Sequence, residues 1–275
     1  MGAIRFGPAH VPSREDPAAA IDALMAGGYT ACEINFGRGF WMEYDFAQEL
    51  GEMAREAGIA LSLHAPLPAF LGHADRGKKY RMAIGMLDHS AGIAKAAGAE
   101  PVVLHPGYLL GRDHAASIAA VVEQMGSLRE RLEAKDRAVP FGVEVMGRVT
   151  EFGNIDDVVA IASQLDWVRP VIDFAHMHAT SDGAFMTVVP FHEALTKADA
   201  VIEPGAPFHI HFSDIAYANR NENRHLPYGE GTLRAEPMAE ALGELDRPAT
   251  VIGESPDDAS NQAIQSVLAA YLSPR

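Results

Sequence analysis

Short, mostly apolar runs alternate with longer amphipathic segments along the whole chain. The runs have the length and bounding turns of buried strands, and they occupy residues 4–6, 32–35, 59–63, 101–104, 139–143, 168–172, 208–210 and 250–252. Each is followed by a segment with the apolar spacing of a helix, at residues 16–26, 44–57, 79–97, 115–134, 155–165, 189–198, 236–245 and 259–272. The pattern therefore predicts eight successive strand-then-helix units.

Eight such units in a chain of 275 residues favour an α/β fold consisting of a single (β/α)8 TIM barrel domain over residues 1–275. Glycines that end helices recur before the second, third and fourth strands, as Ala-Gly-Gly, Ala-Gly and Ala-Ala-Gly. An open, doubly wound sheet is the alternative if two units are miscounted. No GxGxxG motif follows the first strand, so a dinucleotide-binding sheet lacks its usual signal.

Polar residues end six consecutive strands of this pattern. The strand ends read SLHAPL, VVLHPG, FGVEVMG, VIDFAHMHA, HIHFSD and VIGESP. They place a histidine or a carboxylate at His64, His105, Glu144, Asp173, His176, His211, Asp214 and Glu254. A TIM barrel builds its active site from the carboxyl ends of its strands, so we expect most of these side chains to converge on the barrel axis.

Convergence of this kind indicates bound metal. A single histidine or carboxylate at a strand end usually makes a loop hydrogen bond or caps a helix, but carboxylates crowded together without a cation repel one another and lose hydration. A mixed imidazole and carboxylate set suits Zn²⁺, Mn²⁺ or Fe²⁺. One such ion takes about four ligands, so the set predicts more than one metal and a bridging carboxylate. The loop after the seventh strand adds His225, and His178 is expected to be an outer-shell or solvated residue.

Composition limits the partners of such a site. The chain is 48% hydrophobic and 21% charged, and its only cysteine, Cys32, excludes an intrachain disulfide. No basic and then apolar leader is visible, and no apolar run reaches the roughly 18 residues of a membrane helix. We expect a cytoplasmic protein with no membrane partner and no evident obligate protein partner. The net charge of −15 argues against a nucleic-acid partner unless bound metal neutralises many carboxylates.

In combination these motifs resemble a known family. HAP at 64–66, LHPG at 104–107, IDxxH at 172–176, HxxD at 211–214 and RHxxxGEG at 224–231 accompany the strand-end glutamates 144 and 254. The chain resembles the endonuclease IV-like apurinic/apyrimidinic (AP) endonucleases, AP endonuclease family 2 of the xylose-isomerase-like TIM barrel superfamily. The resemblance covers nearly the whole chain.

The resemblance implies a cluster of zinc ions in the barrel mouth, two or three in number. It assigns His64, His105 and Glu144 to the first zinc; Glu144, Asp173, His211 and Glu254 to the second; and His176 and His225 to the third. The family has an aspartate as the remaining ligand of the third zinc. Asn223, a weaker neutral ligand, stands in that position, and the adjacent Glu222 is a substitute if the loop shifts.

The resemblance also implies contacts with DNA. Leu67 stands where the family has a tyrosine that holds open the abasic gap. Arg38 lies in about the place of an arginine that enters the DNA, and Phe40 and Trp41 beside it are either stacking residues or ordinary loop packing.

Three functions follow as hypotheses. The first is zinc-dependent hydrolysis of damaged double-stranded DNA 5′ to abasic sites in base excision repair, with Glu144 and Glu254 as catalytic residues and Glu254 orienting or deprotonating the attacking water. The second is a sugar isomerase or epimerase of the same superfamily, which needs one metal and two carboxylates as an acid and base pair. The third is a metal-binding barrel without catalysis.

Overall fold

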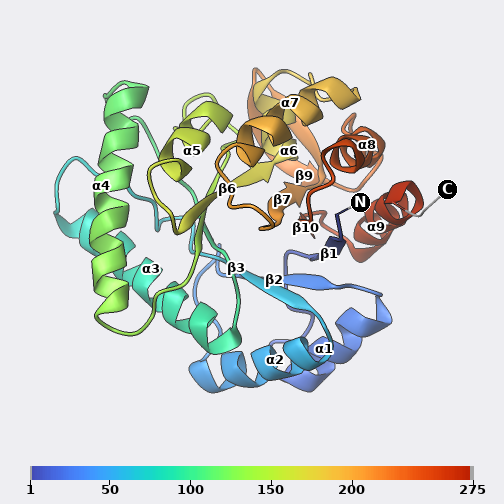
Figure 1. Cartoon of the computed structure of the whole chain (residues 1–275), viewed down its shortest axis with the longest axis horizontal. Helices are drawn as coiled ribbons and strands as arrows, with labels where there is room; N and C mark the ends of the chain where they lie inside the picture. Colours follow the sequence, from blue (N-terminus) through green and yellow to red (C-terminus); the bar gives the residue numbers. More distant parts are fainter. Residues whose placement is uncertain (1, 273–275) are drawn as a thin grey trace.

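The computed structural model describes residues 2–272. Parallel strands form a sheet that curls into a nearly closed barrel (Figure 1), in the order β1-β10-β7-β6-β5-β4-β3-β2. The eight strands are β1 Ile4–Pro8, β2 Ala31–Asn35, β3 Ala60–His64, β4 Val102–Leu104, β5 Phe141–Glu144, β6 Val168–Asp173, β7 Phe208–Phe212 and β10 Ala249–Gly253. The predicted TIM barrel is confirmed.

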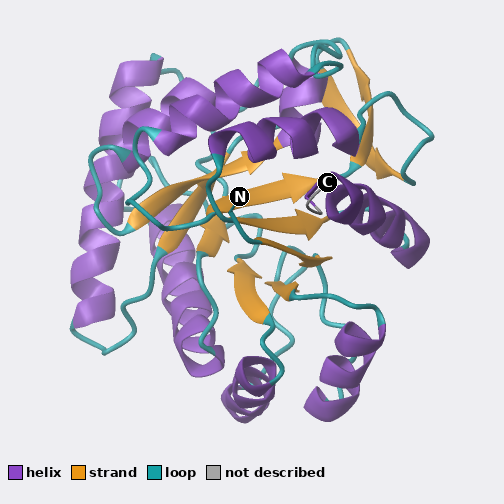
Figure 2. Cartoon of the chain, turned by 45° about the vertical axis from the view of Figure 1, so that its right-hand side comes forward, coloured by secondary structure: helices purple, strands orange, loops and turns teal. Residues whose placement is uncertain are grey.

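Helices surround the strands on the outside (Figure 2). They are α1 Pro17–Ala26, α2 Tyr44–Glu56, α3 Lys78–Ala97, α4 His114–Glu133, α5 Ile155–Ala162, α6 Phe174–Thr180, α7 Val188–Asp199, α8 Ala235–Leu245 and α9 Asp258–Leu272. Local chemistry sets their ends. Asp16 accepts hydrogen bonds from Ala18 N and Ala19 N before α1, and Gly98 ends α3 in the left-handed conformation with φ of 62°.

The barrel closes at a seam between β1 and β2. β1 pairs along its length with β10 and lies beside β2, to which a backbone hydrogen bond of 2.9 Å runs from Thr30 N to Phe6 O. The strand residues are almost all buried, which explains why the strands read as continuous apolar runs rather than alternating ones. The barrel interior is therefore packed with side chains. Polar residues line the mouth at the carboxyl ends of the strands.

Two elements differ from the expected pattern. The segment after β6 forms a short helix, α6, because the Asp173 side chain caps it by accepting a hydrogen bond from His176 N at 2.7 Å. The segment after β7, expected to be a loop, contains two strands: β8 Asp214–Ala218 and β9 Asn221–Leu226 form an antiparallel hairpin. Both additions lie at the carboxyl end of the strands.

No helix within residues 2–272 has both the length and the apolar character needed to cross a lipid bilayer.

Candidate metal centre

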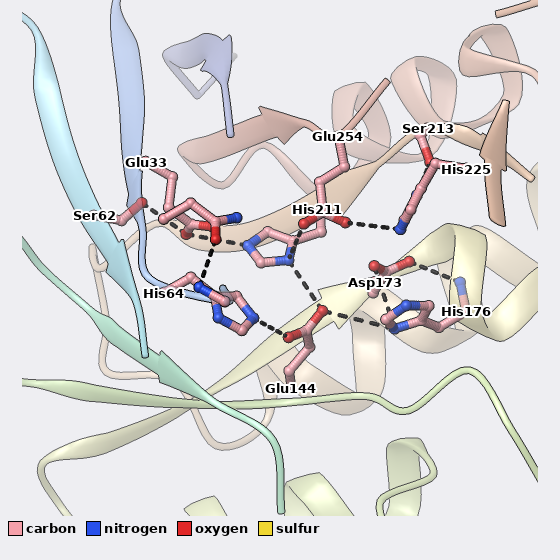
Figure 3. Close-up of polar contacts among 12 residues, drawn as sticks. Glu33, Ser62, His64, Glu144, Asp173, His176, His211, Ser213, His225 and Glu254 are labelled. Atoms are coloured by element: carbon pink, nitrogen blue, oxygen red, sulfur yellow. Dashed lines mark hydrogen bonds and ion pairs between the residues drawn. The ribbon is translucent and has the colours of Figure 1, made fainter. Parts of the chain in front are cut away.

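The strand-end residues converge in the barrel mouth, as Figure 3 shows. Histidines and carboxylates in the mouth form three groups, and within each group the potential ligand atoms all lie within 4.8 Å of one another. The groups are His64, His105 and Glu144; Glu144, Asp173, His211 and Glu254; and His176, Glu222 and His225. Because the first two groups share Glu144, they form one continuous centre rather than separate clusters.

Glu144, at the end of β5, is the bridge between the first two groups. Its Oε2 lies 3.1 Å from His64 Nε2 and 3.1 Å from His105 Nε2, and its Oε1 lies 3.1 Å from His211 Nδ1. One carboxylate oxygen therefore faces each group, which is the arrangement of a carboxylate that bridges two cations. Burial raises the pKa of Glu144, but the neighbouring histidines His211 and His105 outweigh it and hold the pKa well below its usual value.

Glu254, at the end of β10, connects the second group to the third. Its Oε1 lies 3.6 Å from His211 Nδ1, and its Oε2 lies 3.9 Å from His225 Nε2. Asp173 lies deeper and is fully buried, with an Oδ2 atom that has no hydrogen-bond partner among the described residues. Burial raises the pKa of Asp173 well above its usual value, and the charges of Glu254 and Glu144 add to that rise despite the opposing effect of His176. A cation beside Asp173 would offset both the cost of burying its charge and the repulsion from Glu254 and Glu144.

The third group contains Glu222, the substitute that the sequence offered, and not the weaker ligand Asn223. Glu222 Oε2 lies 2.9 Å from His176 Nε2, whereas Asn223 is exposed. A β-bulge causes the exchange: Ala216 pairs with Arg224 and Tyr217 pairs with Glu222, so Asn223 is the extra residue of β9. A bulge changes which side chains of a strand face inward, and here a carboxylate turns toward the centre.

A glycine makes room for this contact. Gly147 follows β5, and a Cβ atom there would lie 2.7 Å from both Glu222 Oε2 and His176 Cδ2. Burial raises the pKa of Glu222, but its hydrogen bond and ion pair with His176 dominate and lower the pKa to about 2. The third group is therefore a complete set of one carboxylate and two imidazoles, a combination that suits the same ions as the first group.

The ring nitrogens of the histidines are oriented by contacts outside the groups. His64 Nδ1 lies 2.7 Å from Ala65 O, and His176 Nδ1 lies 2.8 Å from Val145 O. Each carbonyl accepts the Nδ1 proton, so Nε2 is left free toward the centre. His225 Nδ1 lies 2.6 Å from Ser213 Oγ, so a hydrogen bond holds this ring as well. Such contacts are typical of histidines that bind metal.

Two polar residues at this end of the barrel contact the segment after β9 and do not belong to the ligand groups. Asp214 is fully buried and accepts hydrogen bonds from Gly229 N and Gly231 N, so it holds the segment after β9 in place. His178 is also buried: its Nε2 lies 2.9 Å from Thr232 Oγ1, which makes it part of the packing beneath the hairpin rather than a solvated residue.

A cavity of about 410 Å³ opens above the centre. Its lining includes Arg38 and Leu67, with Leu67 51% exposed. Trp41 does not line it: the indole Nε1 donates to Asn35 O at 3.0 Å, and its ring packs edge-on against Phe36 and Phe46. Of the two residues expected to contact DNA, only Arg38 faces the mouth, and Trp41 has the packing role.

A further carboxylate, not predicted from the sequence, lies beneath the centre. Glu33, in the middle of β2, is fully buried beside His209 and His211, and these three residues form a fourth compact group. Glu33 was hidden because it lies inside a strand rather than at its end. A charged residue inside an otherwise apolar run was the one available signal.

Comparison with known proteins places the chain in a family. The family described as xylose isomerase-like TIM barrel matches residues 21–272. The chain belongs to the xylose isomerase-like TIM barrel family. A member from Methanocaldococcus jannaschii, described as an uncharacterized protein, is 33% identical over 254 residues, covering 91% of each chain. A protein of Pediococcus pentosaceus named as a probable endonuclease 4 is 25% identical over 203 residues, covering 72% of this chain and 62% of its own length.

Solved structures of proteins with different described activities share the fold. Endonuclease IV from Thermus thermophilus superposes with a TM-score of 0.74 at 17% identity, covering 98% of this chain and 98% of that one. A D-tagatose 3-epimerase-like protein superposes equally well, with a TM-score of 0.74 at 18% identity, covering 98% of this chain and 97% of that one. The expected relationship to endonuclease IV is confirmed, and likeness in fold alone does not separate nucleases from epimerases.

Proposed function

We propose that this member of the family is a metal-dependent phosphodiester hydrolase that cleaves damaged double-stranded DNA 5′ to abasic sites. The observation that carries the proposal is the continuity of three ligand groups, in which Glu144 bridges the first to the second and Glu254 spans the second and third. A centre of two or three zinc ions, or of Mn²⁺ or Fe²⁺, fits this donor set. An isomerase needs one metal and has no use for the histidines of the first group.

Bound divalent metal would supply Lewis acidity to the phosphate and to a water molecule. The ligands for the first ion would be His64, His105 and Glu144. Asp173, His211 and Glu254 would join Glu144 around the second ion, and His176, Glu222 and His225 would hold the third.

The remaining steps belong to the protein. Glu254 is 14% exposed on its side chain and lines the cavity, so it can orient the attacking water and accept its proton. Arg38 is exposed on the rim of the same cavity and supplies a positive charge for the DNA backbone. Leu67, close to Gly37 on the same rim, offers an apolar surface in place of an aromatic ring.

The test is nicking of a duplex with one abasic site by zinc-loaded protein, with the undamaged duplex as control. Glu254→Gln should reduce nicking by at least about a thousandfold, because it removes the proton acceptor and weakens a metal ligand. Arg38→Gln should weaken DNA binding and leave the metal content unchanged. Intact abasic duplex with every divalent metal tried would overturn the proposal.

A sugar epimerase is the second candidate. It is supported by the net charge of −15, which disfavours a polyanionic substrate, and by the four-residue group that an epimerase needs for its single metal. His105→Ala separates the two candidates, since this residue belongs only to the first group. The variant should lose nicking activity if the protein is a nuclease, whereas it should retain turnover of a ketose if the protein is an epimerase.

A further inference from the structure

Glu33 lies one layer of side chains below the candidate metal centre. On β2, Glu33 pairs in register with Ser62, two residues before the pair of Asn35 with His64. Its side chain points into the barrel toward His211 (Figure 3) and is fully buried. A buried carboxylate needs strong partners, so its contacts indicate what it does.

Three donors meet on one oxygen of this carboxylate. Glu33 Oε2 lies 3.2 Å from His211 Nε2 and 3.4 Å from His209 Nε2, and it accepts a hydrogen bond of 3.0 Å from Ser62 Oγ. The other oxygen, Oε1, has no hydrogen-bond partner among residues 2–272. All the hydrogen-bond contacts of this carboxylate are therefore made by the oxygen that faces His211.

His211 is turned differently from the other histidines of the centre. His64 and His176 direct Nδ1 at a backbone carbonyl and leave Nε2 for the metal groups. His211 directs Nδ1 at Glu144, 3.1 Å away, and Nε2 at Glu33. The hydrogen-bond acceptor of His211 Nε2 is a carboxylate, whereas the acceptors of His64 Nδ1 and His176 Nδ1 are backbone carbonyls. A carboxylate acceptor makes an imidazole a stronger ligand than a neutral carbonyl does.

We propose that Glu33 is a positioning residue for the metal centre: it accepts the Nε2 proton of His211 and thereby keeps the Nδ1 lone pair directed at the group formed with Glu144, Asp173 and Glu254. This inference rests on the proposed metal centre and not on the substrate. The negative charge of Glu33 strengthens the ligand from below, while Ser62 and His209 hold the carboxylate in place.

The structure argues against a purely structural ion pair. A pair that only filled the barrel would not need to reverse the ring of His211 relative to its neighbours. The reversed ring places one nitrogen in each of two groups, so the imidazole links Glu33 to the centre directly. A substitution at Glu33 should therefore alter metal binding through the imidazole of His211.

The test is zinc affinity, measured by competition with a chromophoric chelator on the full-length protein. Glu33→Gln keeps the shape of the side chain and removes its charge, so zinc should bind at least about tenfold more weakly at one site, as found when outer-shell partners are lost. Ser62→Ala is the matched control: it removes a donor to the same oxygen without touching His211, and affinity should change less than about threefold. Equal affinity of folded Glu33→Gln and the unmodified protein would overturn the proposal.

A measurement on the unmodified, zinc-loaded protein covers the case in which Glu33→Gln does not fold. Long-range ¹H–¹⁵N spectra, assigned with His211→Gln, should show His211 protonated at Nε2 and bound at Nδ1. A proton at Nδ1, or an anomalous-scattering peak showing a metal among Glu33, His209 and His211, would overturn the proposal. Zinc binding needs no DNA, so a protein that binds zinc in this way but leaves abasic DNA intact would refute only the nuclease.

Discussion

Two clusters of charged residues in this protein surround a buried carboxylate with different kinds of partner. Asp88, on α3, is 3% exposed and contacts Arg131, Lys135 and Arg137 from α4 and the segment after it. Glu144, in the barrel mouth, is 1% exposed and faces imidazoles instead. Arginine and lysine keep their charge at every working pH, so the first cluster can only hold helices together.

The imidazoles of the second cluster allow protons to be exchanged for metal ions. A histidine can exchange its proton for a metal ion at the same nitrogen. The centre in the barrel mouth can therefore replace protons with ions, which the Asp88 cluster cannot do. Burial alone does not mark a functional site; what marks it is burial beside partners that titrate.

The largest expected effect is that of Glu144→Gln. Because each oxygen of Glu144 faces a different ligand group, the variant should weaken zinc binding at two sites together, by more than about a hundredfold, beyond what loss of an outer-shell partner produces. Metal analysis after dialysis against a weak chelator measures this. Loss of one ion only would show that Glu144 does not bridge.

Asp88→Asn should lower stability without changing metal content. Burial raises the pKa of Asp88, but Lys135, Arg131 and Arg137 together lower it to about 2. The folded pKa is depressed, so the contribution is full above about pH 4, the unfolded value, and is lost as the pH falls toward 2. The cations are 33–45% exposed on their side chains, so we expect a loss of about 2 kcal/mol rather than the larger cost of breaking a fully buried pair.

Urea unfolding at neutral pH measures this loss, and zinc content provides the control. If Asp88→Asn lost zinc while its free energy of unfolding stayed the same, the contrast between the two clusters would be wrong.

Zinc affinity should fall as the pH is lowered. Burial lowers the pKa of His64, but the hydrogen bond and charge of Glu144 dominate and raise the pKa to about 9 in the metal-free protein. Zinc must displace that proton, so affinity should drop by up to about tenfold for each pH unit below this value. Chelator competition at several pH values tests it, and an affinity independent of pH would contradict it.

Asp173→Asn should have the smallest effect on stability, and of opposite sign. The pKa of Asp173 is raised in the folded protein, so the ionised form destabilises the metal-free fold at neutral pH. Asparagine removes that charge and can still cap α6 through its side-chain oxygen. We expect the metal-free protein to gain about 1 kcal/mol, measured by thermal unfolding, while zinc binding weakens. A less stable metal-free variant would argue that Asp173 is already well paired.

Much of the fold was readable because each barrel strand is a short buried run followed by an amphipathic helix. The strand-end ligands could be found for the same reason, since the barrel brings all carboxyl ends together. Glu222 could not be chosen over Asn223, because the choice depends on a bulge in the hairpin, and a one-residue slip reverses which side chains face inward.

Two other residues depended on tertiary contacts. Trp41 has the composition of a stacking residue, and only packing against Phe36 and Phe46 shows that its ring is used inside the protein. Glu33 lies inside a strand, where the sequence shows no ligand pattern. Its contact with the centre becomes visible only in the fold, which brings His211 of β7 to its carboxylate. Both depend on residues distant in sequence, which local patterns do not report.

The seam of the barrel has a consequence for how the centre is assembled on folding. β1 and β10 are the two described barrel strands that lie farthest apart in sequence, yet they pair along the length of β1. Glu254 follows β10 directly and spans the second and third ligand groups. Pairing of β10 between β1 and β7 therefore closes a long loop of chain and brings Glu254 to the barrel mouth in the same event. Barrel closure and completion of the second ligand group are coupled, because both require β10 to be in register.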